Sequence, residues 1–253
     1  MSDILTQIVL GVFAVGLAII PHELAHGYAA LALGDDTARA AGRLSLNPLR
    51  HVDRVGTILL PGFLLISQLL LPPHQVRFMF GWAKPVPIGN WKFRDPRRGM
   101  ALVAAAGPLM NFFLAWVGAL LMPVPSSPLP AGIDPLDAAV AQHPLIGLFL
   151  FYFILTNLVL GLFNLLPIPP LDGGRIAVGV LPLPLAQRWA RLERAGIVVV
   201  ILLIFVLPLL LGQFGIAFDP FRAALETVVP WAFHILFLLS GHGASLGQAV
   251  QHV

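Results

Sequence analysis

Long runs of apolar residues dominate the pattern of the chain. Five blocks are long enough to cross the hydrocarbon core of a bilayer, which takes about 20 helical residues. These blocks are residues 4–33, 100–121, 145–171, 195–211 and 223–239. A sixth block, 55–71, is shorter and has Pro61-Gly62 in its middle, which is typical of a broken or re-entrant segment. The pattern predicts an all-α polytopic membrane protein with about five transmembrane helices, one re-entrant or short sixth segment, and a small membrane-surface β-hairpin at the alternating positions 39–46.

The basic residues indicate how these blocks are oriented. Of the 15 Lys and Arg residues, all but Arg222 lie in segments 34–54, 72–99 and 172–194, whereas 122–144 has none. Cytoplasmic loops of membrane proteins collect Lys and Arg. If the block 55–71 re-enters instead of crossing, 14 of the 15 basic residues lie on one face. We therefore predict a multi-pass protein of the cell membrane (inner or plasma membrane), with the loop after the first block in the cytoplasm.

Composition excludes several function classes. Hydrophobic residues make up 58% of the 253 residues and charged residues only 11%, whereas a soluble domain has about 25% charged residues. The chain has no cysteine, so disulfides and cysteine-ligated metal sites are excluded. The net charge of +3 gives no indication of a nucleic-acid partner.

The first apolar block contains the motif that carries chemistry. Its sequence HELAH at residues 22–26 is the H-E-x-x-H pattern, in which two histidines one helical turn apart ligate the same metal. Glu23 reaches the edge of that face, where it is placed to act on a water molecule and not to bind the metal. A charged residue inside a span costs about 2.5 kcal/mol or more, and a divalent cation beside His22 and His26 would offset that cost.

A catalytic zinc usually has three protein ligands, so a third ligand is expected elsewhere in the chain. Asp172 is the best candidate, because it ends a long apolar block and is followed by two glycines. The prolines at 167, 169 and 170 prevent a regular helix just before it. Unwound backbone at membrane depth lines a cavity or is buried in protein. From spacing alone, a metal ligand and an ordinary Asp-Gly turn are equally open.

Three motifs in this order resemble a known family. HELAH, GPLMN at 107–111 and NLLPIPPLDGGR at 164–175 resemble the site-2 protease family of intramembrane zinc metalloproteases. FGWAKPVPI at 80–88 is similar to a compact prokaryotic branch without a PDZ domain. The resemblance implies one Zn2+ per chain, held by His22, His26 and Asp172, with Glu23 as the general base.

The resemblance also implies that Asn111 lies near the active site, where it would bind substrate. The alternative for Asn111 is an interhelical hydrogen bond, since an amide inside a span needs a partner. Asn164 is a weaker candidate for substrate binding.

Together these observations predict an intramembrane zinc metalloendopeptidase. It would hydrolyse a peptide bond within or near the transmembrane helix of another protein, with its active site nearer the cytoplasmic side. Residues 1–176 would form the catalytic membrane core, and 177–253 the C-terminal transmembrane helices and tail. The expected partners are the lipid bilayer and single-span membrane proteins, such as a pre-cleaved membrane-bound regulator.

Two alternatives belong to other function classes. A metal-binding membrane transporter would also place polar residues in its spans, but it has no need of a carboxylate beside the ligands such as Glu23. A non-catalytic scaffold that binds membrane helices is disfavoured because the ligand set is complete.

Overall fold

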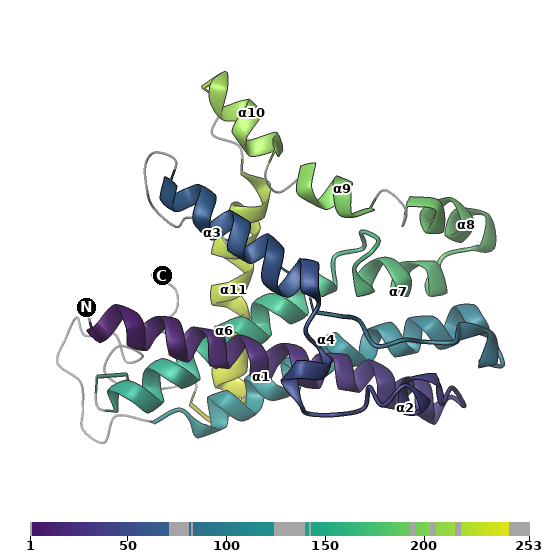
Figure 1. Cartoon of the computed structure of the whole chain (residues 1–253), viewed down its shortest axis with the longest axis horizontal. Helices are drawn as coiled ribbons and strands as arrows, with labels where there is room; N and C mark the ends of the chain where they lie inside the picture. Colours follow the sequence, from purple (N-terminus) through teal and green to yellow (C-terminus); the bar gives the residue numbers. More distant parts are fainter. Residues whose placement is uncertain are drawn as a thin grey trace.

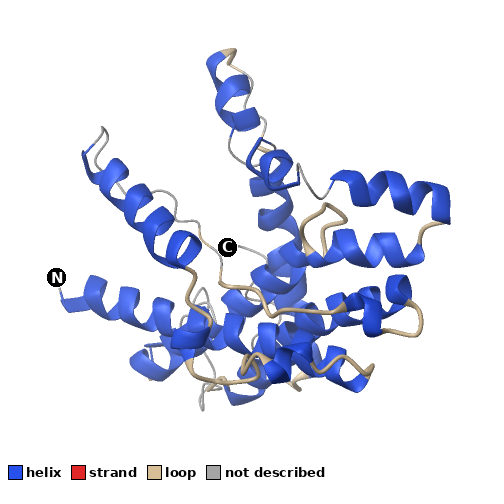
Figure 2. Ribbon diagram, turned by 45° about the vertical axis from the view of Figure 1, so that its right-hand side comes forward, coloured by secondary structure: helices blue, strands red, loops and turns tan. Residues whose placement is uncertain are grey.

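Every regular element is a helix in the part of the chain that the computed structural model describes, which is residues 2–70, 81, 83–123, 140–141, 143–192, 196–202, 206–215 and 219–242 (Figure 2). The α-helices are α1 (Ser2–Ala32), α2 (Thr37–Ala40), α3 (Leu60–Leu70), α4 (Pro96–Leu121), α6 (Pro144–Asn164), α7 (Asp172–Val180), α8 (Leu183–Arg191), α9 (Gly196–Ile201), α10 (Leu207–Gln213) and α11 (Pro220–Leu239). Three single turns complete the set: η1 (Pro48–Arg50), η2 (Arg54–Leu59) and η3 (Asn90–Lys92).

Four of the described helices are long and apolar enough to cross a membrane. They are α1, from Leu5, α4, α6 and α11, from Arg222. The outer face of α1 carries large apolar side chains that no protein covers, such as Leu5, Ile8 and Val12. Such an exposed apolar stripe on a long helix fits a hydrocarbon environment and not water. The prediction of an all-α polytopic membrane protein is therefore confirmed.

The centre of the bundle is α4, which packs against α1 on one side, α6 on another and α7 near its N-terminal half (Figure 1). Small residues allow this close packing. A Cβ at Gly118 of α4 would lie 2.8 Å from Ile154 of α6, so only glycine lets the two helices approach this closely. Ala115 and Ile154 belong to a buried cluster that α11 closes with Phe233 and Phe237.

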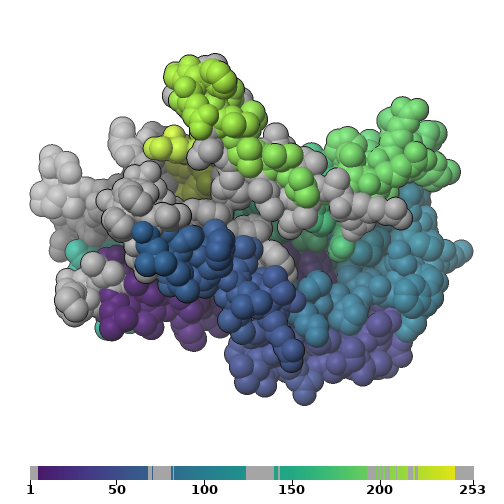
Figure 3. All heavy atoms as spheres, turned by 45° about the horizontal axis from the view of Figure 1, so that its top comes forward, coloured from purple at the N-terminus to yellow at the C-terminus, as the bar shows by residue number. Residues whose placement is uncertain are grey.

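Two predicted membrane segments take a broken form. The block 55–71 forms the π-helical turn η2 followed by α3, and its apolar helix from Arg54 to Ser67 is shorter than a span. The Asp53 carboxylate caps η2 by accepting hydrogen bonds from the N–H groups of Val55 and Gly56. Re-entry of this segment stays a prediction. The block 195–211 lies partly outside the described residues; its described parts are α9 and α10, and α10 projects from the body of the molecule (Figure 3).

The predicted surface hairpin at 39–46 was wrong. Residues 37–40 form the short helix α2, and Gly42 then turns the chain at a φ of 63°. The polar groups here find partners other than a second strand. The side chain of Arg43 donates to the carbonyl of Lys84, and the carboxylate of Asp35 accepts from the backbone of Thr37. Of the alternating leucines, Leu44 packs against α1, where a Cβ on Gly27 would meet its side chain, whereas Leu46 is exposed.

Candidate metal centre and active site

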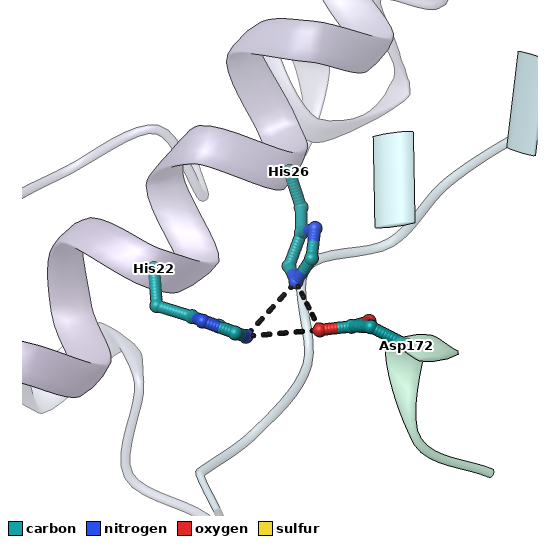
Figure 4. A group of neighbouring side chains, drawn as sticks. All are labelled: His22, His26 and Asp172. Carbon is teal, nitrogen blue, oxygen red and sulfur yellow. Dashed lines mark hydrogen bonds and ion pairs between the residues drawn. The ribbon is translucent and has the colours of Figure 1, made fainter. Parts of the chain in front are cut away.

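Three predicted ligands meet at one point in the bundle. His22 and His26 extend from the same side of α1, and Asp172 faces them from the first turn of α7 (Figure 4). The two Nε2 atoms lie 3.0 Å apart, and each lies 3.3 Å from Oδ2 of Asp172. All three residues are buried. The structure thus brings together residues that are 146 positions apart in the chain, counting from 26 to 172.

The Nδ1 atoms of both histidine rings, which point away from Asp172, already have hydrogen-bond partners. Nδ1 of His26 lies 2.7 Å from the carbonyl oxygen of Val103, and Nδ1 of His22 lies 2.6 Å from Oδ1 of Asn111. A backbone carbonyl only accepts, so Nδ1 of His26 carries the proton and its Nε2 presents a lone pair to the centre. Such hydrogen bonds to the second nitrogen are what orient metal-binding histidines.

The donor atoms fit a zinc ion. Zinc in a tetrahedral site lies about 2.0–2.1 Å from nitrogen and oxygen ligands, which places the ligands roughly 3.3 Å from one another. The three observed separations of 3.0, 3.3 and 3.3 Å match that spacing. Oδ2 of Asp172 is buried and makes no hydrogen bond to any described residue. A buried carboxylate oxygen without a donor, facing imidazole lone pairs, calls for a cation.

Gly107 of α4 makes room for both histidine rings. A Cβ at this position would lie 2.5 Å from Cε1 and Nε2 of His26 and 2.6 Å from Cε1 of His22. Any side chain would therefore push the rings away from Asp172. In the sequence, Gly107 stands out only as part of the GPLMN motif, with no role of its own. A glycine followed by Pro108 inside an apolar block was the one local sign that this position is special.

The segment before Asp172 explains the two glycines that follow it. Helix α6 ends at Asn164 and α7 begins at Asp172, so the proline-rich stretch between them is non-helical, as predicted. A Cβ on Gly173 would lie 2.3 Å from the carbonyl oxygens of Leu165 and Leu166. Only glycine lets α7 start this close to the end of α6, and that start places Asp172 opposite the histidines.

Glu23 lies outside the ligand cluster and is held from another direction. Its Oε2 accepts a hydrogen bond of 3.0 Å from the backbone N–H of Val86. Val86 belongs to the segment 83–89, which crosses the end of α1 and which we call the strap. Residues 85 and 87 are prolines and have no N–H, so Val86 is the one possible backbone donor among these three.

The strap is fixed at both ends. At residue 84 its carbonyl accepts from Arg43, and its N–H donates to the carbonyl of His51. At the far end the N–H of Gly89 donates to the buried Asp35, 2.6 Å away. The residues of this segment carry no local signal for a partner on α1, so its support for Glu23 could not be predicted from the sequence.

The two predicted substrate-binding residues have different settings. Asn111 is fully buried, and its amide bonds to His22, to the carbonyl of Ala18 and to Asn157. Asn164 is half-buried at the end of α6, where its amide donates to the carbonyl of Leu160. Substrate contact by either residue stays a prediction; what is observed for Asn111 is the interhelical bonding that was its alternative.

An apolar cavity of about 520 Å³ lies between α1 and α4. Pro21, Tyr28 and Leu109 are among its lining residues, and none of the three ligands is. Pro21 therefore borders this cavity, on a different side of α1 from the metal-binding face.

Comparison with known proteins decides the family. The chain is 40% identical over 188 residues to YwhC of Bacillus subtilis (strain 168), which is named as a candidate zinc metalloprotease; the match covers 74% of this chain and 76% of YwhC. The sequence model of peptidase family M50 matches residues 126–209, which include Asp172. The chain belongs to peptidase family M50, the site-2 protease family.

A second M50 relative supports the same assignment. Rip2 of Mycobacterium tuberculosis (strain H37Rv), also named as a candidate zinc metalloprotease, is 31% identical over 194 residues, covering 76% of this chain and 65% of Rip2. No solved structure matches the chain. The M50 family membership and the four long apolar helices together identify the protein as a multi-pass membrane metalloprotease.

Proposed function

We propose that this protein is an intramembrane zinc endopeptidase that cleaves single-span membrane proteins within or near their transmembrane helix. The observation that carries the proposal is the convergence of two imidazole nitrogens and one carboxylate oxygen inside a bundle of apolar helices, with Glu23 directly after His22 on the same helix. A peptide bond that reaches this point has to come from a chain that is itself in the membrane.

His22, His26 and Asp172 would hold the zinc. Zinc bound there supplies Lewis acidity, which polarises a peptide carbonyl and makes a water molecule acidic near neutral pH. Glu23 accepts the proton of the attacking water and then delivers it to the leaving amine. Its bond to Val86 uses Oε2, so Oε1 is the oxygen that takes the proton while the strap keeps the carboxylate in place.

The substrate has to present an unwound peptide bond. A carbonyl within an intact helix is already hydrogen bonded along the helix, so local opening of the substrate helix must precede attack. A regulator already trimmed by another protease fits this requirement, because a helix end close to the site opens more easily than a helix centre.

The proposal is tested with purified protein in lipid vesicles, together with a panel of single-span proteins. Glu23→Gln should abolish cleavage while zinc stays near one per chain, and His22→Ala should lose both. Glu226→Gln is the matched control. Glu226 is exposed on α11, far from Glu23 in the sequence, and is paired with Arg222 on its own helix. Cleavage by the Glu23→Gln variant would refute the mechanism. Zinc passage across the vesicle without cleavage would support the transporter instead.

We also propose that the active site lies nearer the cytoplasmic side of the cell membrane. The absence of native cysteines allows single-cysteine labelling. Cysteines that replace Lys84 and Arg188, one at a time, should both react with a label applied to the cytoplasmic face, which is exposed in inverted membrane vesicles. Labelling of the two positions from opposite sides would contradict the re-entrant arrangement of 55–71.

A further inference from the structure

A second asparagine, Asn157, lies behind the metal centre and takes no part in the proposed reaction. Asn157 is in the middle of α6, is fully buried, and is surrounded by an apolar helix. Its Nδ2 donates to the carbonyl of Phe153 at 2.8 Å, and its Oδ1 accepts from Nδ2 of Asn111 at 2.9 Å. Burying an amide at this depth without hydrogen-bond partners costs roughly 2–7 kcal/mol, so the partners of Asn157 are necessary for the stability of the fold.

The hydrogen bonds of this group have only one possible direction. Phe153 offers a carbonyl, which can only accept, so Asn157 must turn its NH2 toward Phe153 and its oxygen toward Asn111. Asn111 must then turn its NH2 toward Asn157 and toward the carbonyl of Ala18, 3.2 Å away. This leaves Oδ1 of Asn111 facing Nδ1 of His22, at 2.6 Å.

The last hydrogen bond of this series sets the tautomer of His22. Since Oδ1 of Asn111 can only accept, Nδ1 of His22 must carry the proton, and Nε2 keeps its lone pair for the metal. His26 reaches the same state in one step, through the carbonyl of Val103. His22 reaches it in two steps, through side chains of α4 and α6.

We propose that Asn157 is a positioning residue of the metal centre: through Asn111 it fixes the tautomer and ring orientation of His22. The inference rests on the metal site of the proposed function. Removing Asn157 leaves one N–H of Asn111 without an acceptor, so the amide and the imidazole lose their fixed orientation. Loss of such outer support weakens metal binding about 10- to 100-fold, and we expect about 10-fold here because the Ala18 carbonyl still holds the other N–H.

The test compares Asn157→Leu with Asn157→Asp and Thr156→Val in full-length protein in detergent. Leu removes both bonds and keeps the same number of side-chain heavy atoms and the same branch at Cγ. A protonated Asp restores both bonds, since its O–H donates to Phe153 and its carbonyl accepts from Asn111. Thr156→Val is the matched control, a polar-to-apolar change one position earlier on α6.

Two readouts are taken on each variant. Competition with a chelator should show zinc binding about 10-fold weaker in Asn157→Leu, and within about twofold of the native protein in the other two variants. Nitrogen-15 NMR of histidine-labelled, metal-free protein should show a protonated Nδ1 for His22 in the native protein and in Asn157→Asp, and a mixture of tautomers in Asn157→Leu.

The outcomes separate the inference from the proposed function. A native protein that binds no zinc would overturn the proposed function, whereas the NMR comparison would still decide the role of Asn157. Equal zinc affinity and equal His22 signals in Asn157→Leu and Thr156→Val would overturn the inference alone. So would an Asn157→Asp variant that loses as much zinc affinity as Asn157→Leu, because the effect would then not depend on the hydrogen bonds.

Discussion

The histidines and the glutamate of the HELAH motif share one helix but are held by different parts of the molecule. The histidines are oriented from within the bundle, by Val103 and Asn111 of α4. Glu23 is oriented from the other direction, by the N–H of Val86 in the strap. The proposed ligands thus depend on helix packing, whereas the proposed general base depends on one hydrogen bond from a loop.

This difference matches what each group has to do. A metal ligand must keep its position to within a fraction of an ångström, and close-packed helices provide that rigidity. A general base must lie within hydrogen-bond reach of the proton that it takes, and one loop bond of 3.0 Å is enough to orient the Glu23 carboxylate through Oε2 while Oε1 stays available. Damage to the bundle should therefore remove the metal, and damage to the strap should slow the reaction while the metal stays.

The largest effect is expected from Gly107→Ala in the bundle. The added Cβ would lie 2.5 Å from the imidazole of His26, which is held in place by Val103 and cannot retreat. Zinc affinity, measured by chelator competition, should fall about 100-fold. Gly16→Ala in α1 is the control, because nothing lies within 4 Å of that Cβ. Equal zinc affinity in the two variants would mean that the rings do not need the space at Gly107.

A smaller and more selective effect is expected from Val86→Pro in the strap. Proline removes the N–H that holds Glu23, so the carboxylate should lose its orientation. Cleavage should slow about 10-fold, since misplacing a catalytic group by about 1 Å costs up to 100-fold, while zinc affinity stays unchanged. Val86→Ala keeps the N–H and should retain most of the rate. A parallel loss of zinc in Val86→Pro would show that bundle and strap are not independent.

The smallest effect is expected at the anchor of the strap. Burial alone would raise the pKa of Asp35, but hydrogen bonds from Thr37 and Gly89, together with the Lys92 ammonium, hold the pKa of this carboxyl below its ordinary value. Because the folded pKa is lower than the unfolded one, near 3.9, the charged carboxylate stabilises the fold above about pH 4. That stability is lost as the pH falls through the folded pKa.

Asp35→Asn should therefore lower the unfolding temperature at pH 7, by an amount that corresponds to one lost buried hydrogen bond, about 1–3 kcal/mol. The difference from the native protein should shrink as the pH falls below about 4, because the unfolded chain then binds a proton that the folded carboxylate does not, and it should be smallest once the pH is below the lowered folded pKa. Asp36→Asn is the control: Asp36 is exposed and paired with the same lysine, so its substitution should lower the unfolding temperature much less than Asp35→Asn. A difference for Asp35 that does not depend on pH would contradict the assigned role.

The sequence predicted the elements that depend on local pattern. The apolar blocks became α1, α4, α6 and α11 because each is long enough to satisfy its own backbone in a membrane. The spacing of His22 and His26 placed both on one side of α1. The prolines and glycines around Asp172 predicted a break at the position where the chain returns to the histidines. Each of these signals lies within a few neighbouring residues.

The features that were missed depend on distant partners. The pattern at 39–46 alternates like a strand, but the decisive contacts of Asp35 and Arg43 are with the strap, 54 and 41 residues later in the chain. No local signal pairs Val86 with Glu23, or Asn157 with Asn111. An asparagine inside an apolar helix shows that a partner exists; it does not show which helix supplies it.

The origin of the three ligands has a consequence for assembly. Two come from the first helix and the third from position 172, so a cation at this site would close a loop of 146 residues between His26 and Asp172. For a flexible chain, closing a loop of this length costs about 4–5 kcal/mol, and the free energy of binding a cation in the folded state would offset that cost. The ion would thus join α1 to a segment synthesised much later, and the protease would gain its reactive centre when these two segments meet.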